Sequence, residues 1–364
     1  MPAAGSTINA TDYNTLQSKI ATILGNGQAT DNFGYGQAVT SGQVSGPGVS
    51  TPGDSVTHTQ LRELYDDMAS AWIHQNGSAG TQINTLLKYI DQGDIIGADA
   101  TGDGITYEEN TDNYTIDNEE NTGGINDFST VLALIEASRT TVGAGQTDTN
   151  LSAVSDSRNS SWNGNVDSEF TVTFNNADQR RYFFNSGGQI TIAGAIDAAT
   201  LGAAGSASRQ RNDGWNSMVT TPGTVRMGYN YTTYDGASTN ITKPDGEIGN
   251  GELNTSAYQI LLRREAAAGD YEDSYWQVEA YIQQAGRTAS AAQGNNGDKS
   301  ILRFRVLLHD DGPETNADAG AKGSIEPGVV EPVTVDIDFT YGFRRSINAV
   351  NVAAPSVIRV NTFE

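Results

Sequence analysis

The sequence predicts an α+β protein, with a helical N-terminal region followed by an antiparallel β-sandwich. Apolar residues recur at helical spacing in the first part of the chain, whereas from Ser152 onwards they alternate with polar residues. Hydrophobic residues make up 37% and charged residues 18% of the 364 residues, a composition typical of loop-rich β architecture. We therefore expect a helix plus an extended Gly-rich arm (1–55), an acidic helical region (56–150) and a β-sandwich with a C-terminal arm (151–364).

The N-terminal region begins with an amphipathic helix over residues 6–24, which opens on a capping signature. Residues 25–52 are rich in Gly and Ser, but they carry the apolar residues Phe33, Tyr35 and Val39. Side chains set among glycines cannot easily be buried within one chain. We therefore interpret this stretch as an assembly arm that packs on a neighbouring subunit.

The second region predicts helices over residues 57–77, 81–93 and 125–143. Residues 1–150 hold 4 Lys+Arg and 19 Asp+Glu (net −15), and residues 151–364 hold 17 and 25 (net −8), which together give the total of −23. Most of the excess negative charge therefore lies in the N-terminal part. Such a surface repels nucleic acid and anionic membranes, so we expect neither as a partner.

The C-terminal region reads as a series of strands separated by turns rich in Gly, Asn, Asp and Pro. The expected strands are residues 168–176, 188–196, 224–234, 256–265, 275–285, 299–310 and 332–342. Several short strands with no long helix between them predict an antiparallel sandwich. The tail, residues 347–364, predicts either a last strand or an arm that reaches a neighbouring subunit.

Three consecutive aromatic residues, Tyr182, Phe183 and Phe184, follow a possible helix cap at Asn176 and precede a Gly-Gly pair. This pattern predicts a short helix between two strands. Consecutive residues on a helix point in different directions, so they cannot form a flat stacking platform. An architectural plug that closes one end of the sandwich is favoured over a binding platform for a base or sugar.

The acidic stretch DATGDGITYEEN, residues 99–110, resembles an EF-hand calcium loop. Asp99, Thr101 and Asp103 occupy ligand positions 1, 3 and 5, but Asn110 replaces the bidentate Glu of position 12. A turn on a solvated acidic surface explains the stretch without an ion, and a calcium site is the alternative. We expect no cofactor, and weak calcium binding as the most that this loop supports.

Other chemistry has little support in the sequence. The chain has no Cys, and its three His residues show neither the spacing of zinc ligands nor a nucleophile motif nearby. Abundant carboxylates alone do not indicate a glycosidase. We therefore expect a non-enzymatic protein. No signal peptide and no apolar run of about 18 residues is visible, so we expect the protein to be made in a cytoplasm.

Several phrases of the chain stand out: INATDYNTLQSKIATILGNG and FGYGQ within residues 8–37, HQNG at the end of residues 59–77, ADQRRYFFNSGGQI within residues 162–190, and WNSMV and GTVRMG within residues 215–228. In these phrases the chain resembles structural proteins of tailed marine bacteriophages. The resemblance implies a neck, tail, baseplate or fibre component of the virion with no chemistry of its own. Its partners would be copies of itself and other virion proteins.

Two alternatives remain open. The first is a host-surface glycan-binding module of the virion, which would show an exposed groove lined by aromatic residues. The second, less favoured, is a tail enzyme that degrades glycans, which would place two facing carboxylates in a cleft.

Overall fold

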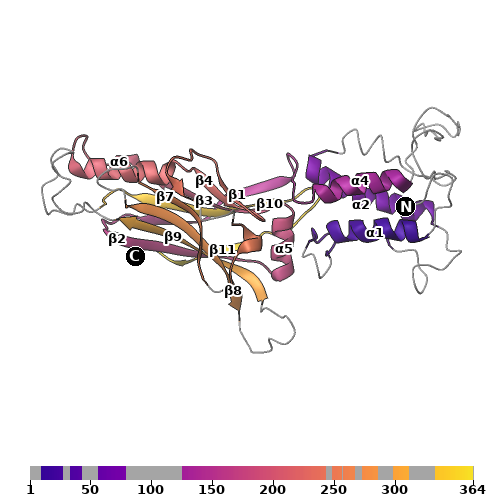
Figure 1. The fold of residues 1–364 in the computed structure, drawn as a ribbon. Helices are drawn as coiled ribbons and strands as arrows, with labels where there is room; N and C mark the ends of the chain where they lie inside the picture. Colours follow the sequence, from indigo (N-terminus) through magenta and orange to yellow (C-terminus); the bar gives the residue numbers. More distant parts are fainter. Residues whose placement is uncertain are drawn as a thin grey trace. The chain divides into compact units, whose positions relative to one another are not determined.

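A computed structural model describes residues 10–27, 33–42, 56–78, 125–242, 248–255, 257–266, 273–285, 298–310 and 333–363. The protein is of the α+β class, with helices in its N-terminal part and two antiparallel sheets after them (Figure 1), so the predicted fold class is confirmed. None of the helices described is long and apolar enough to span a membrane.

The chain divides into two compact units that are not continuous in sequence. The helical unit comprises Met1–Asp148, Arg181–Gly187 and Ser346–Ala353, and the sandwich unit comprises Thr149–Arg180, Gly188–Arg345 and Ala354–Glu364. The sequence suggested contiguous regions instead. Two short segments from the second half of the chain thus belong to the helical unit, which no local pattern predicts.

The helical unit is built on α1 (Ala10–Ile23), α2 (His58–Asn76) and α4 (Ile125–Ala137). Each helix buries an apolar stripe at helical spacing. The buried residues include Tyr13, Leu16 and Ile20 of α1, Leu61, Leu64 and Met68 of α2, and Phe128, Val131 and Ile135 of α4. The helix expected over residues 81–93 lies outside the described residues.

The ends of α2 show why this helix was predictable. Thr57 and Gln60 form a reciprocal capping box at its start, and Gly77 ends it in the left-handed conformation with φ of 83°. The stop predicted at Gly77 is therefore confirmed.

The sandwich unit contains a five-stranded and a six-stranded sheet. The first has the order β1 (Thr147–Arg158), β10 (Ile337–Ser346), β3 (Gln189–Ile196), β4 (Thr224–Met227) and β5 (Thr232–Tyr234). The second has the order β11 (Ser356–Asn361), β2 (Gly164–Thr173), β9 (Asp298–Asp310), β8 (Tyr275–Ala285), β7 (Gln259–Glu265) and β6 (Ile241–Thr242).

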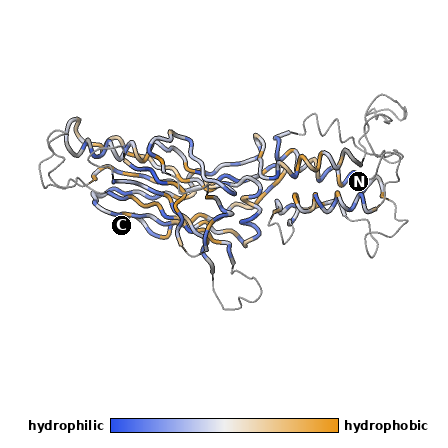
Figure 2. The backbone as a smooth tube through the Cα atoms, in the orientation of Figure 1, coloured by the Kyte–Doolittle hydropathy of each residue, from blue (hydrophilic) through white to orange (hydrophobic). Residues whose placement is uncertain are grey.

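The inner faces of the two sheets pack against each other through aromatic rings. Phe170 of β2 stacks on Tyr341 of β10, with ring centroids 4.1 Å apart, and Tyr341 donates a hydrogen bond to Ser168 at 2.9 Å. Trp276 of β8 lies 5.5 Å from Phe339 of β10. Hydrophobic and hydrophilic residues alternate along the strands (Figure 2), as expected for a sandwich whose outer faces carry polar side chains.

The structure contains elements that the sequence did not predict, among them α6, β1 and the short strand β6. Helix α6 (Ala207–Thr220) buries Trp215, Met218 and Val219, and its Met218 carbonyl accepts a hydrogen bond from Trp276 Nε1 at 2.7 Å. Its polar composition and internal Gly214 hide the helical pattern. Strand β1 was missed because most of its residues are exposed, so it shows no apolar alternation.

Residues 224–234 were expected to form one strand but form two. A turn in which the Gly228 N–H donates to the Tyr231 carbonyl at 2.8 Å separates β4 from β5. The tail forms β11, which is the first of the two forms considered for it.

Candidate functional site

The arm, residues 25–27 and 33–42 among those described, is part of the helical unit. Phe33 and Tyr35 are 2% and 0% exposed, and Val39 is half-buried. The backbone N–H of Tyr35 donates to the carbonyl of Ile23 at 3.0 Å. The expectation that these side chains cannot be buried within one chain is therefore wrong for Phe33 and Tyr35, because the same chain covers them. A role of the arm in assembly stays a prediction.

Tyr35 lies at the centre of this packing. Its hydroxyl donates to the carbonyl of Arg139 at 2.7 Å and accepts from Gln75 Nε2 at 3.0 Å. Its ring meets the His74 ring edge to face at 4.9 Å. Burial raises the pKa of Tyr35, so the hydroxyl stays protonated and serves as a hydrogen-bond donor.

Asp67 of α2 holds the far end of the arm. Its Oδ1 accepts hydrogen bonds from the Thr40 backbone N–H (3.1 Å) and hydroxyl (2.8 Å), and its Oδ2 accepts from the same two groups of Ser41 at 2.8 and 2.6 Å. The carboxylate is 3% exposed. Four donors thus compensate the burial of one negative charge.

Helix α5 (Ala177–Asn185) holds the near end of the arm through its last turns. Arg181 donates from Nη1 to the Phe33 carbonyl at 2.5 Å and from Nη2 to the Asn26 carbonyl at 2.9 Å. Asn185 Nδ2 donates to the Gly34 carbonyl at 3.1 Å. Asp67, Arg181 and Asn185, which we call the clamp residues, therefore bind backbone groups of the arm, which lies outside the helices and strands.

The three aromatic residues lie in α5, so the short helix predicted after Asn176 is present. Asn176 caps it, because its Oδ1 accepts a hydrogen bond from the Gln179 N–H at 2.8 Å. Tyr182, Phe183 and Phe184 are 6%, 0% and 1% exposed. Tyr182 packs on Gly36 of the arm, and the role of the three residues as an architectural plug of the sandwich stays a prediction. A Cβ at Gly36 would come within 2.2 Å of the Tyr182 ring, and φ at Gly36 is 71°.

His74 is a fully buried imidazole in the same unit. Its Nδ1 lies 3.3 Å from the Ser346 hydroxyl, which lies 2.5 Å from the Val350 carbonyl and donates its proton there. The hydroxyl oxygen therefore accepts from the Nδ1–H of a neutral ring. Nε2 has no hydrogen-bond partner among the described residues. Burial lowers the pKa of His74 to about 4.

A second group of polar residues covers the outer face of the six-stranded sheet. Glu169 Oε1 accepts from the Tyr258 hydroxyl at 2.6 Å, and Oε2 pairs with Arg303. Glu279 Oε2 accepts from Arg305 Nε at 2.7 Å. Burial alone would raise the pKa of Glu169, but the hydrogen bonds from Tyr258 and Arg303 outweigh it and lower the pKa.

Two tyrosines of this face lie against guanidinium groups. Arg305 lies over the Tyr258 ring at 4.5 Å and Arg263 over the Tyr275 ring at 3.6 Å. One face of each ring is therefore covered from within the sheet.

A buried ion pair joins α6 to β9. Arg211 pairs with Asp310, both side chains being 0% exposed, and Trp215 Nε1 donates to Asp310 Oδ1 at 3.3 Å. Burial raises the pKa of Asp310, and Arg211 and Trp215 oppose that effect. The pair fixes the position of α6 on the sheet.

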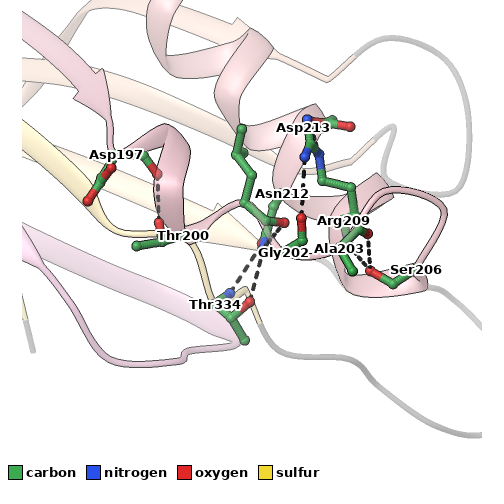
Figure 3. A network of polar contacts seen from close by, with 10 residues as sticks. Asp197, Thr200, Gly202, Ala203, Ser206, Arg209, Asn212, Asp213 and Thr334 are labelled. Atoms are coloured by element: carbon green, nitrogen blue, oxygen red, sulfur yellow. Dashed lines mark hydrogen bonds and ion pairs between the residues drawn. The ribbon is translucent and has the colours of Figure 1, made fainter.

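A polar network fixes the connection between β3 and α6 (Figure 3). Asn212 Nδ2 donates to the Leu201 carbonyl at 3.1 Å and to the Thr334 hydroxyl at 3.0 Å, and Thr334 N–H donates back to Asn212 Oδ1 at 3.3 Å. Ser206 caps α6 by accepting from the Arg209 N–H at 3.1 Å. Here too, polar side chains hold loop backbone in place.

The calcium ligands considered in the sequence, Asp99, Thr101 and Asp103, lie outside the described residues. Within the ranges described, no three His, Asp or Glu side chains gather in a way that could hold a metal ion.

Sequence reasoning missed the clamp residues. Asp67 bonds to residues 26 and 27 positions earlier in the chain, and Arg181 to one 148 positions earlier, so no local pattern marks them. One signal was available. A Gly-rich arm without secondary structure must find partners for its backbone polar groups, and polar residues on buried helix faces are the candidates.

Comparison with protein-family models, with curated proteins and with solved structures finds no match for this chain.

Proposed function

We propose that this chain is a non-enzymatic structural subunit of a tailed bacteriophage particle, placed in its neck, tail, baseplate or fibre. Its partners are other copies of the chain and other virion proteins, and its location is the virion.

One observation carries the proposal. The phrases that resemble phage structural proteins include residues 8–37 and 162–190. In the helical unit these stretches meet, because Arg181 and Asn185 bind the backbone of Asn26, Phe33 and Gly34. The phage-like phrases thus include the two segments whose contacts hold the arm in place.

The buried polar side chains of both units support the same role. Asp67 and Asn212 each bind loop segments far away in the sequence. Buried hydrogen-bond networks of this kind specify one geometry of the chain. A subunit of a symmetric assembly needs such a defined geometry, since each copy must present the same surfaces.

A complementation experiment tests the proposal. Phage that lack this chain should stop at one stage of particle assembly, visible by electron microscopy, and the wild-type chain supplied in trans should restore complete particles. Arg181→Ala should restore them less well, whereas Arg209→Ala, at an exposed ion pair of the sandwich unit, should behave as wild type. Complete particles formed without the chain would contradict the structural role.

Phage that lack this chain also distinguish the structural role from the glycan-binding alternative. If particles are complete without the chain but no longer adsorb to the host, and if the purified chain binds host-surface glycans, the alternative replaces our proposal.

A further inference from the structure

The buried imidazole of His74 lies where four segments of the helical unit meet. Its ring, on α2, contacts the Tyr35 ring of the arm at 4.9 Å. Its Nδ1 lies 3.3 Å from the Ser346 hydroxyl, and its backbone carbonyl accepts from the Gly143 N–H at 2.7 Å. One residue thus joins α2, the arm, the turn of residues 143–146 and the segment Ser346–Ala353, which we call the return segment.

The return segment is held by the turn and by the arm. The Ile347 N–H donates to the Gln146 carbonyl at 3.2 Å. Gln37 of the arm and Asn351 exchange two hydrogen bonds, from Gln37 Nε2 to the Asn351 carbonyl at 3.0 Å and from the Asn351 N–H to Gln37 Oε1 at 3.2 Å. Val350 is fully buried. The segment therefore keeps its place through contacts with distant parts of the chain.

The site fits a neutral imidazole and has no place for a second ring proton. The Ser346 hydroxyl donates its own proton to the Val350 carbonyl, so its oxygen accepts from the Nδ1–H of His74. Protonation adds an N–H at Nε2, which has no hydrogen-bond partner among the described residues. Because the side chain is 0% exposed, water does not solvate the new charge. Such a charge is costly to bury.

The segments behind His74 offer no counter-ion. The turn and the return segment contain no titratable side chain, and none lies within one turn of His74 on α2. Asp67 lies two turns earlier on α2, where four donors of the arm bind its carboxylate. Arg345 precedes the return segment, and because side chains alternate along β10, it points to the opposite face from Ser346.

The arm and α4 offer no counter-ion either. Tyr35 faces the imidazole, and burial raises its pKa, so it stays neutral. Arg139, whose carbonyl accepts from the Tyr35 hydroxyl, is a cation and opposes a second positive charge. Glu136 of α4 is exposed and pairs with Lys19 of α1 at 3.8 Å. Burial is accordingly the cause of the lowered pKa of His74.

We propose that His74 is an acid-sensitive latch, whose protonation releases the return segment and the arm from α2 while the sandwich unit keeps its fold. Opening uncovers Tyr35 and Val350, which are both 0% exposed in the closed form. The inference goes beyond the proposed structural role and does not depend on it, because every group of the latch belongs to the helical unit of one chain.

The direction and size of the effect follow from the two pKa values of His74. An exposed histidine titrates near pH 6.5, whereas the pKa of His74 in the closed form is about 4. Between these values the open form binds a proton that the closed form does not, so opening becomes more favourable as the pH falls. From about pH 7.5 to about pH 4.5 the equilibrium constant for opening should rise about seventyfold.

Hydrogen exchange of the isolated full-length chain, followed by mass spectrometry at these two pH values, tests the latch. Protection factors of the return segment and of residues 33–42 should fall on acidification by about seventyfold more in wild type than in His74→Gln. Carboxylates titrate in both proteins, so their effect cancels in this comparison. His74→Phe keeps a ring against Tyr35 and provides a second non-titrating variant should His74→Gln alter the fold, as judged by circular dichroism.

Ser346→Ala separates titration from a structural contact. It removes the acceptor of Nδ1–H but keeps the imidazole, so it should lower protection at both pH values and retain the pH dependence.

Equal loss of protection on acidification in wild type and in both His74 variants overturns the latch. So does an equal loss in β8 and β9, because acid would then unfold the whole chain instead of opening the helical unit. The measurement needs no phage, so a failure of the latch leaves the structural role to its own test.

Discussion

At the scale of single residues, His74 links the stability of the helical unit to pH. In the unfolded chain a histidine titrates near pH 6.5, whereas burial lowers the folded pKa of His74 to about 4. Between these values the unfolded state binds a proton that the folded state does not, so stability is lost as the pH falls from about 6.5 to 4. The expected loss is about 3 kcal/mol, measured by urea unfolding followed through hydrogen exchange of α2.

Carboxylates also titrate in this window, so the test compares variants. His74→Gln should reduce the slope of stability of the helical unit against pH, and the test compares this variant with wild type. An unchanged slope in His74→Gln would show that the buried imidazole is not the group responsible.

Phe184 tests the packing of α5. Its side chain is 1% exposed and meets the Phe183 ring edge to face at 5.0 Å. Phe184→Ala should lower the free energy of unfolding by about 3–5 kcal/mol, the usual cost of emptying a buried aromatic site. Thermal or urea denaturation measures it. A near-neutral effect together with lost partner binding would mean that the aromatic residues serve as a binding surface.

At the scale of elements, the arm depends on Asp67. Asp67→Ala removes four hydrogen bonds to Thr40 and Ser41 and should cost about 1.5–3 kcal/mol. Hydrogen exchange within residues 33–42 should rise strongly. Asp66→Ala is the control, because Asp66 is the adjacent aspartate on the same helix and its side chain is exposed. Equal protection of the arm in both variants would remove Asp67 from the clamp.

The elements differ in how far the sequence predicts them, for physical reasons. Helix α2 has a capping box, an apolar stripe and a terminal glycine, and β8 was predicted over the range it occupies, so local signals suffice. Strand β1 carries no alternation because it is exposed on an edge, and α6 is polar with an internal glycine. Local signals are absent in both.

The clamp was beyond the sequence for another reason. Arg181 and Asn185 of α5 bind an arm segment about 150 positions earlier in the chain. The sequence predicts exposed side chains in the arm because it does not show which distant residues cover them. The aromatic triplet was read as buried on a short helix, but its packing on the arm required the tertiary contacts. The spacing of apolar residues along the chain predicts helices and strands, but it does not show which distant residues come into contact.

At the scale of the whole molecule, each unit has its own core. Deleting residues 1–55 removes α1 and the arm, which supply Tyr13, Ile20 and Tyr35 to the core of the helical unit. We expect that unit to unfold while the sandwich keeps its two sheets. Calorimetry should therefore show two unfolding transitions for the full chain and one for the truncated chain. Loss of both transitions would show that the sandwich depends on the helical unit.

The truncated chain should also fail to enter particles, since its helical unit no longer presents a defined surface. Incorporation at wild-type levels would show that residues 1–55 have no role in assembly.

We propose that this chain is a building block of a phage particle, and quantitative mass spectrometry of purified particles is the decisive experiment. We expect a fixed number of copies per particle, in an integer ratio to the other structural proteins that matches a rotational symmetry of the particle. Absence of the chain from purified particles, or an amount that varies between preparations, would contradict it.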